Sequence, residues 1–393
     1  MKHFFILGSH PALSLAELYA RLPLREVTLI DEACIAEAGE LEDASRLISS
    51  LGGTVKIGTI VSTVKSSAEL LAAGERVLAD MPKDGKFNFG ISVYGKTNLK
   101  TLPLGLELKK SLRLKDISCR FVTSKDKTLS SVVVEQNKLT RGGVELVLIA
   151  NGKDIHVGVT GAVQPFKDLS HRDYGRPARD DRSGMLPPKL ARMMVNIAQP
   201  KKALLDPFCG SGTVLMEAIL LHPELEITGS DIDERQTKGA IANLDWLRKS
   251  GSITNEERAR VNVLHFPVQE VSRQLQNDFF DAIVTEGYLG KPLKGHESPQ
   301  FLERNHADVT TLWKEALPVL AKQQPQGGRL VCTWPIMMSQ NHPYYVELSD
   351  EELREAGYKR IHPLAAWSND DKAIVYRRAD QHVHRQLIVL EKV

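Results

Sequence analysis

The stretch LLDPFCGSGTVLMEAIL, residues 204–220, places an acid, a proline and two glycines between an apolar strand and an apolar helix. Glycine lets a backbone approach a ligand closely, so a turn of this composition indicates a binding loop as well as a change of direction. From residue 201 onward, strand-like and helix-like segments alternate around this stretch. The alternation predicts an α/β fold with a doubly wound, mostly parallel sheet.

The elements expected in this second half follow one another in regular order. We expect strands at 202–206, 226–233, 260–266, 279–287 and 328–334, and helices at 213–221, 234–250 and 309–322. The final run, 373–392, consists of two strand-like segments around a polar turn and is expected to form an antiparallel edge hairpin.

Residues 1–165 mix short strands and helices without a regular βαβ rhythm, which is typical of an α+β region. We expect strands at 3–7, 26–30, 54–64, 86–95, 118–124, 130–139, 144–152 and 154–163, and helices at 11–22, 67–81 and 104–115. Residues 166–200 are expected to form a polar linker followed by a lead-in helix at 186–198. The second domain then covers residues 201–393.

The turn after residue 206 favours a particular kind of ligand. In doubly wound sheets, ligands bind outside the carboxyl ends of the strands, where Asp206 would lie. Its carboxylate suits an amine and repels a pyrophosphate, and Leu215 stands where a dinucleotide fingerprint has its third glycine. Asp231 ends the next strand and could accept both ribose hydroxyls. The pattern therefore favours an adenosine that carries an amino acid and no phosphate.

Simpler explanations of these residues remain open at this point. The glycines could serve only a tight turn between strand and helix, and Asp231 could be a helix N-cap. Cys209 is more typical of a small buried residue than of a nucleophile.

Charge is uneven along the chain although the net charge is only +2. Residues 81–145 carry 13 Lys and Arg against 6 Asp and Glu, whereas residues 1–80 carry 7 against 11. A basic middle fits a nucleic-acid footprint, and a solvated basic face without a partner is the alternative. The residues expected to contact an RNA backbone are Lys109, Lys110, Arg113, Lys115, Arg120 and Arg176. Arg179, Arg182 and Lys189 are further candidates; together with Arg176 they could instead close over the bound ligand or belong to a solvated linker. Asp181 and Ser183 could cap the helix that follows.

Several function classes are disfavoured by composition. The four cysteines lie far apart without a CxxC pair, which argues against a zinc site and suits a reducing, cytoplasmic environment. No apolar run approaches 18 residues, so no membrane span is expected. The opening run MKHFFILGSH is too brief for a secretory signal and is expected to be a first strand.

The motif DPFCGSGT (206–213) resembles motif I of S-adenosylmethionine-dependent amino-methyltransferases, which methylate exocyclic nitrogens of bases. The preceding GRPARDDRSGMLPPKLARMMVNIA (175–198) is similar to the segment that enters the catalytic domain in the Trm11 and archaeal tRNA guanosine-10 N2-methyltransferase family. This resemblance covers about residues 165–393. Residues 50–165 resemble loosely the THUMP RNA-binding domain of that family, after a ferredoxin-like start.

The resemblance implies a Rossmann-like class I methyltransferase domain with S-adenosyl-L-methionine as cofactor. The residues it implies for cofactor binding are Asp206, Phe208, Gly210, Gly212, Thr213, Asp231, Ile232 and Gln269. The family often places an Asp near position 267 to hold the adenine amino group. This chain has Pro267 there, so backbone groups or Gln269 would hold the adenine.

The family's catalytic loop reads D/N-P-P-Y/F, and this chain has IVTEGYLG at 283–290. Glu286 would replace the acid that accepts hydrogen bonds from the target amine, Gly287 the first proline, and Tyr288 would supply the stacking ring. Leu289 stands at the usual aromatic position. The loop is therefore either a variant active site or a degenerate one. The chemistry rests on positioning and electrostatics and requires no metal.

The leading hypothesis is an RNA methyltransferase that modifies an exocyclic amine, most specifically guanine N2 in tRNA, with the target base flipped into the pocket. Alternatives are a DNA amino-methyltransferase and a non-catalytic RNA-binding factor, and an NAD-dependent oxidoreductase is disfavoured by Leu215 and Asp206. The oligomeric state is left open by the sequence.

Overall fold

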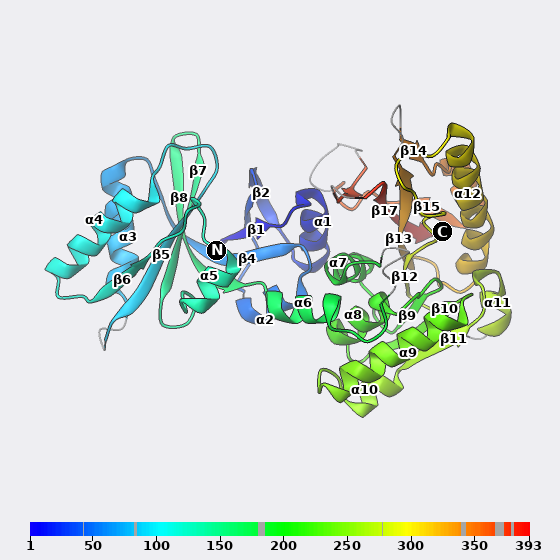
Figure 1. The fold of residues 1–393 in the computed structure, drawn as a ribbon. Helices are drawn as coiled ribbons and strands as arrows, with labels where there is room; N and C mark the ends of the chain where they lie inside the picture. Colours follow the sequence, from blue (N-terminus) through cyan, green and yellow to red (C-terminus); the bar gives the residue numbers. More distant parts are fainter. Residues whose placement is uncertain are drawn as a thin grey trace. The chain divides into compact units, whose positions relative to one another are not determined.

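The computed structural model describes residues 1–41, 43–81, 85–179, 185–276, 278–338, 343–365, 373–378 and 381–393. These residues form two compact units (Figure 1): unit 1 comprises Met1–Ser14 and Leu22–Asp168, and unit 2 comprises Leu15–Arg21 and Leu169–Val393. The helix α1 (Pro11–Arg21) contributes residues to both units. The candidates Asp181, Arg182 and Ser183 lie outside the described residues.

Unit 1 is built on an eight-stranded sheet with the order β2-β3-β1-β4-β8-β7-β5-β6. Its strands are β1 (Lys2–Leu7), β2 (Arg25–Ile30), β3 (Ala33–Glu37), β4 (Thr54–Val64), β5 (Phe87–Tyr94), β6 (Cys119–Val122), β7 (Val144–Asn151) and β8 (Asp154–Val163). The strand β5 runs parallel to β6 and β7, and the other neighbours are antiparallel.

The helices of unit 1 are α2 (Ala44–Ser50), α3 (Ser67–Ala79), α4 (Thr101–Leu114) and α5 (Ser131–Gln136). The helices α3 and α4 lie side by side at the β5–β6 end of the sheet (Figure 1). A Cβ atom at Gly105 would lie 2.1 Å from the ring of Phe121, so this glycine allows α4 to pack closely on β6. That packing fixes the basic helix on the sheet.

The prediction of a strand at 130–139 is wrong, because this segment contains the helix α5. Three consecutive β-branched valines favour a strand locally. The side chain of Ser130, however, accepts the N–H of Val133 as an N-cap, and Val134 packs into a small core with Leu129 and Leu139. Capping and tertiary packing outweigh the local preference.

Unit 2 contains a nine-stranded sheet with the order β11-β10-β9-β12-β13-β17-β15, which confirms the predicted doubly wound α/β fold. Its strands are β9 (Ala203–Asp206), β10 (Glu226–Asp231), β11 (Val261–His265), β12 (Ala282–Glu286), β13 (Arg329–Met337), β14 (Tyr344–Tyr345), β15 (Tyr358–Arg360), β16 (Val375–Tyr376) and β17 (Val383–Lys392). Strands β9 to β13 are parallel, and β17 pairs antiparallel with β13, β15 and β16.

Helices cover both faces of this sheet (Figure 1). One layer contains α7 (Pro188–Ala198), α8 (Thr213–Leu221) and α9 (Glu234–Lys249); the other contains α11 (Val271–Gln274) and α12 (Pro299–Ala321). The shorter α10 (Asn255–Ala259), the 3-10 turn at Val268–Glu270 and α13 (Asp350–Glu355) complete the unit. No helix among the described residues combines the length and apolarity needed to cross a bilayer.

Part of the segment predicted as a polar linker is packed into the protein. It forms α6 (Phe166–Tyr174), whose Arg172 is buried and donates from Nε to Glu217 Oε1 over 2.6 Å. Arg192 of α7 donates to the other oxygen of the same carboxylate over 2.8 Å. Two arginines therefore connect α6 and α7 to the fully buried Glu217 of α8.

A buried ion pair lies in the sheet of unit 1. Lys56 of β4 and Glu145 of β7 are both almost completely buried, and the lysine donates to Glu145 Oε1. Ser92 and Thr160 donate to the same carboxylate over 2.5 and 2.7 Å. Burial lowers the pKa of Lys56. The charged form of the buried Lys56 therefore depends on the negative charge of Glu145.

We predict that Glu145→Ala lowers the stability of unit 1 by about 3–5 kcal/mol, because it leaves a buried lysine without its counter-charge. Urea unfolding monitored by circular dichroism measures this loss. Every tryptophan of the chain follows residue 168 in the sequence, and those among the described residues, Trp246, Trp313 and Trp334, lie in unit 2. A fluorescence transition that stays unchanged would therefore locate the effect in unit 1.

The matched control is Glu75→Ala, which removes a surface pair with Lys115. A loss below about 1 kcal/mol is expected there. A Glu145→Ala protein as stable as this control would contradict the prediction.

Candidate functional site

The loop between β9 and α8 has the open geometry expected of a binding loop. Gly210 and Gly212 adopt φ angles of +49° and +84°, in the left-handed region that favours glycine. A Cβ atom at Gly212 would lie 3.0 Å from Ala240 of α9, so this glycine serves helix packing. Nothing lies within 4 Å of the corresponding position at Gly210, so that glycine leaves space for a ligand.

Asp206 lies at the end of β9 and is only 1% exposed. Its pKa is raised to about 7, mainly by burial and less by the negative charges of Asp231 and Glu286, while hydrogen bonds from Thr285 and the Phe208 N–H oppose the shift. Thr285 Oγ1 donates to Asp206 Oδ1 over 2.6 Å. A cationic ligand beside this buried carboxylate would stabilise its charged form.

Asp231 lies at the end of the neighbouring strand β10, as predicted. Its Oδ2 accepts the N–H of Gly210 over 2.9 Å, and its Oδ1 accepts the N–H of Asp233 over 2.9 Å. The carboxylate therefore connects the glycine loop to the tip of β10. Each carboxylate oxygen has two lone pairs, so both keep capacity for a further donor such as a hydroxyl.

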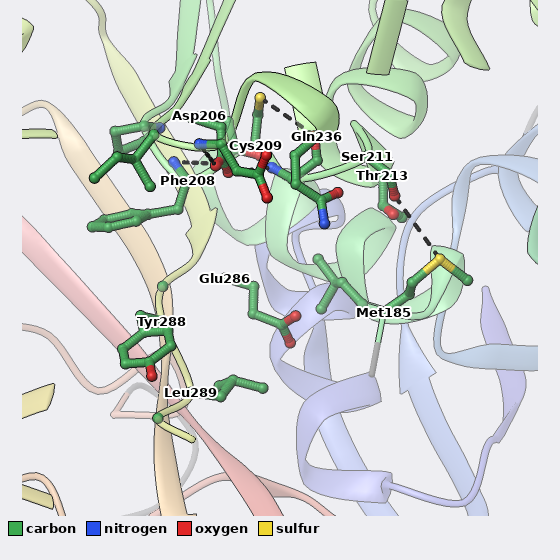
Figure 2. Close-up of a pocket in the computed structure, with 18 of the residues that line it drawn as sticks. Met185, Asp206, Phe208, Cys209, Ser211, Thr213, Gln236, Glu286, Tyr288 and Leu289 are labelled. Atoms are coloured by element: carbon green, nitrogen blue, oxygen red, sulfur yellow. Dashed lines mark hydrogen bonds between the residues drawn. The ribbon is translucent and has the colours of Figure 1, made fainter. Parts of the chain in front are cut away.

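The two acids line one cavity of about 750 Å³ at the carboxyl ends of the parallel strands. Of the residues predicted for cofactor binding and catalysis, all but Gly212 line it: Asp206, Phe208, Gly210, Thr213, Asp231, Ile232, Gln269, Glu286, Gly287 and Tyr288. Figure 2 shows Glu286, Tyr288 and Leu289 across the cavity from the glycine loop. Ile232 is 71% exposed on the rim, an apolar surface that a planar base could cover.

The loop after β12 is held in place by three contacts that the sequence does not reveal. A Cβ atom at Gly287 would lie 2.3 Å from the buried ring of Trp313, so any larger residue at this position would clash with the ring. Asn305, 2% exposed, accepts the N–H of Lys291 over 2.7 Å and donates to its carbonyl over 3.2 Å. The third contact is an ion pair of Glu286.

Arg385 of β17 donates from Nε to Glu286 Oε1 over 2.5 Å, and from Nη1 to Gln381 over 2.9 Å. Sequence reasoning missed Arg385, because no local motif indicates a partner 99 residues away. Only the register of β17 on the sheet brings the two side chains together. Met185 and Leu186, from the segment before α7, also line the cavity without having been predicted.

The prediction that Arg176 contacts RNA phosphates is wrong. The residue is only 2% exposed and donates to Thr213 Oγ1 over 2.6 Å and to Met185 over 3.2 Å. It therefore supports the first turn of α8 from inside unit 2. The other candidate RNA contacts, Lys109, Lys110, Arg113, Lys115 and Arg120, are exposed on α4, just after it and on β6.

Phe208 and Trp313 pack with ring centroids 5.8 Å apart, so Phe208 supports the loop from the core side. Gln269 donates to Glu315 over 3.2 Å at the cavity edge. Within the described residues, no group of three His, Cys, Asp or Glu side chains is arranged to hold a metal ion.

Comparison with known proteins agrees with this geometry. Residues 176–333 match a family model described as "RMKL-like, methyltransferase domain". A tRNA (guanine(10)-N2)-dimethyltransferase from Methanothermobacter thermautotrophicus is 46% identical over 186 residues, which cover 46% of each chain. The chain spans less than half the length of this relative and of others from Methanocaldococcus jannaschii and Pyrococcus abyssi.

Among solved structures, TrmN from Thermus thermophilus matches over 100% of both chains with a TM-score of 0.54 and 18% identity, which supports the fold. A probable tRNA (guanine(10)-N2)-dimethyltransferase from Methanothermococcus thermolithotrophicus is 32% identical over 123 residues, covering 31% of this chain and 72% of that relative. The prediction from the motifs at 175–198 and 206–213 is confirmed: the chain belongs to the Trm11 and archaeal tRNA guanosine-10 N2-methyltransferase family.

Proposed function

We propose that this protein transfers a methyl group from S-adenosylmethionine to an exocyclic base amine, guanine N2 in tRNA. The observation that carries the proposal is the convergence of Asp206, Asp231, Glu286 and Tyr288 on one cavity. The names of the family relatives, which act on guanine 10 of tRNA, support this substrate.

The donor set fits the cofactor. A buried carboxylate at Asp206 would hold its ammonium group, and Asp231 would accept from its ribose hydroxyls. The open space at Gly210 allows a close approach of the backbone. When bound, the cofactor supplies an electrophilic methyl group on a positively charged sulfur.

Glu286 and Tyr288 would act on the base. The Glu286 carboxylate accepts an N–H of the target amine, which counters delocalisation of the nitrogen lone pair into the ring, and it can hold the proton that the amine later gives up. Tyr288, 44% exposed on the cavity wall, offers its ring for stacking.

A non-catalytic RNA-binding factor with a degenerate loop is the competing function. In a loop that has lost its catalytic role, specific contacts to the surrounding core are not expected. The packing of Gly287 on Trp313, the two hydrogen bonds of Asn305 and the buried ion pair of Glu286 instead support a variant active site.

Unit 1 would bind the RNA. The exposed cations of α4 and β6 suit a phosphate backbone, whose affinity for protein depends strongly on salt. The four cysteines are buried and free, which fits a reducing compartment, and we propose the cytoplasm.

We predict that Asp231→Ala weakens S-adenosylmethionine binding by about 10- to 100-fold, because each hydrogen bond to a charged group contributes about 1.5–3 kcal/mol. Titration calorimetry measures the affinity. Asp245→Ala is the matched control, since Asp245 pairs with Arg258 over 2.9 Å and does not line the cavity. Equal affinities of the two variants would count against the cofactor site.

We predict that S-adenosylmethionine binding weakens as the pH falls from 7 to 5.5. The pKa of Asp206 is about 7 in the free protein, so acid protonates the carboxylate that the cationic ligand requires. Well below that pKa, affinity falls by about tenfold per pH unit. This range lies below the pKa of an α-amino group, about 7.7–8.0, so the ligand stays cationic.

Asp206→Asn provides the reference for this pH experiment. Its affinity is expected to be low at pH 7 and nearly constant down to pH 5.5, because the titrating group is gone. A wild-type affinity that is equally constant would exclude Asp206 as the ammonium ligand.

We predict that Glu286→Ala lowers methyl transfer to an unmodified tRNA transcript by at least about 100-fold, because it removes the acceptor of the target amine. Its affinity for S-adenosylmethionine should stay unchanged. Tritium transfer measures the rate, and nucleoside mass spectrometry identifies the product as N2-methylguanosine. Glu226→Gln, which alters a surface pair with Arg260, serves as the control. Cofactor binding without transfer by the wild-type protein to tRNA, rRNA or DNA would favour the binding factor.

A further inference from the structure

Arg385 and Glu286 approach each other across an intervening strand. Glu286 ends β12, where it is paired with Thr333 of β13, and Arg385 lies on β17, on the far side of β13. Two strand spacings, roughly 10 Å, separate β12 from β17, and Arg385 is offset by two residues along the strands from Leu387, the residue opposite Thr333. Two long side chains that extend toward each other can close this gap, and a shorter aspartate would reach less far.

The pair fixes one oxygen of Glu286 and leaves the other available. Oε1 accepts from Arg385 Nε, and within the described part of the chain nothing donates to Oε2. The carboxylate is 15% exposed, and Figure 2 shows it in the cavity between Met185 and Leu289. Arg385 is itself 3% exposed and bonded to Gln381, another cavity residue. Its guanidinium is therefore held in place as well.

Fold stability alone gives a weak reason for such a pair. The desolvation of two charges offsets much of their attraction, so apolar residues of similar size often stabilise a core as well. At a reaction site, such a pair has an electrostatic function. A compensated carboxylate can stay charged in a desolvated cavity, and a charged acceptor forms stronger hydrogen bonds to N–H groups than a neutral one.

We propose that Arg385 is a positioning residue for methyl transfer: it orients Glu286 so that Oε2 accepts an N–H of the target base. This inference rests on the proposed function of Glu286. It also accounts for the glutamate in this loop, because the longer side chain can reach both the arginine and the base.

The test is a double-mutant cycle on single-turnover methyl transfer from tritiated S-adenosylmethionine to an unmodified tRNA transcript. Hydrogen-bond partners that orient metal ligands contribute about 10- to 100-fold to activity, and by analogy we expect about this loss for Arg385→Gln, with cofactor affinity unchanged. In the Glu286→Ala background, Arg385→Gln should change the residual rate by less than about twofold. Arg385→Lys should restore part of the rate. Arg258→Gln, at a surface pair, is the control.

Other outcomes separate the two proposals. A wild-type protein that transfers no methyl group, or a Glu286→Ala protein as fast as the wild type, would overturn the proposed function. A fast Arg385→Gln protein, or an equal loss in both backgrounds, would overturn only the role of Arg385. If Arg385→Gln no longer binds the cofactor, Arg385→Lys decides: intact binding with a reduced rate supports positioning, and lost binding in both variants makes Arg385 structural and overturns the inference.

Discussion

The geometry of the site depends on the buried carboxylate of Glu217. This residue lies one turn into α8, the helix that begins at the glycine loop, and it accepts hydrogen bonds from Arg172 and Arg192. Breaking such a network leaves uncompensated buried charge, which costs about 3–5 kcal/mol. The interaction therefore fixes the start of α8 relative to α6 and α7. It also holds the segment before α7, whose Met185 and Leu186 line the cavity.

Four acidic side chains line this cavity, and the surroundings of their charges differ: Asp206, Asp231, Asp233 and Glu286. Burial raises the pKa of Asp206 to about 7, so this group can relieve repulsion by taking up a proton near neutral pH. Asp231 accepts two backbone N–H groups, and Asp233 and Glu286 each pair with an arginine. Like charges so close would repel one another without these measures. The cofactor end of the cavity, with Asp206 and Asp231, keeps a negative character that suits a cationic ligand and repels phosphate. The contacts to an RNA backbone that we propose therefore involve the exposed cations of unit 1 and not this cavity.

The features that could be predicted from sequence are those with local signals. Alternating strands and helices indicated the α/β sheet, and the acid-glycine loop indicated the cavity with Asp206 and Asp231. Two of the misses have a long-range cause. Buried Arg176 lies in a polar segment that resembles a linker, and Arg385 is connected to the site only through strand register. The helix α5 was missed because β-branched valines favour a strand until capping and packing are counted.

The loop after β12 differs from the catalytic loop of the family in ways that its packing explains. Two prolines would have stiffened the loop, whereas Gly287, in place of the first proline, loses more conformational entropy on folding than any other residue type. Here Trp313 occupies the space beside Gly287, and Asn305 fixes the backbone of Lys291. Rigidity thus comes from neighbouring side chains instead of from proline rings. Because Trp313 leaves no room for a ring at position 287, a proline introduced there alone would disturb the loop, so the glycine and the tryptophan depend on each other.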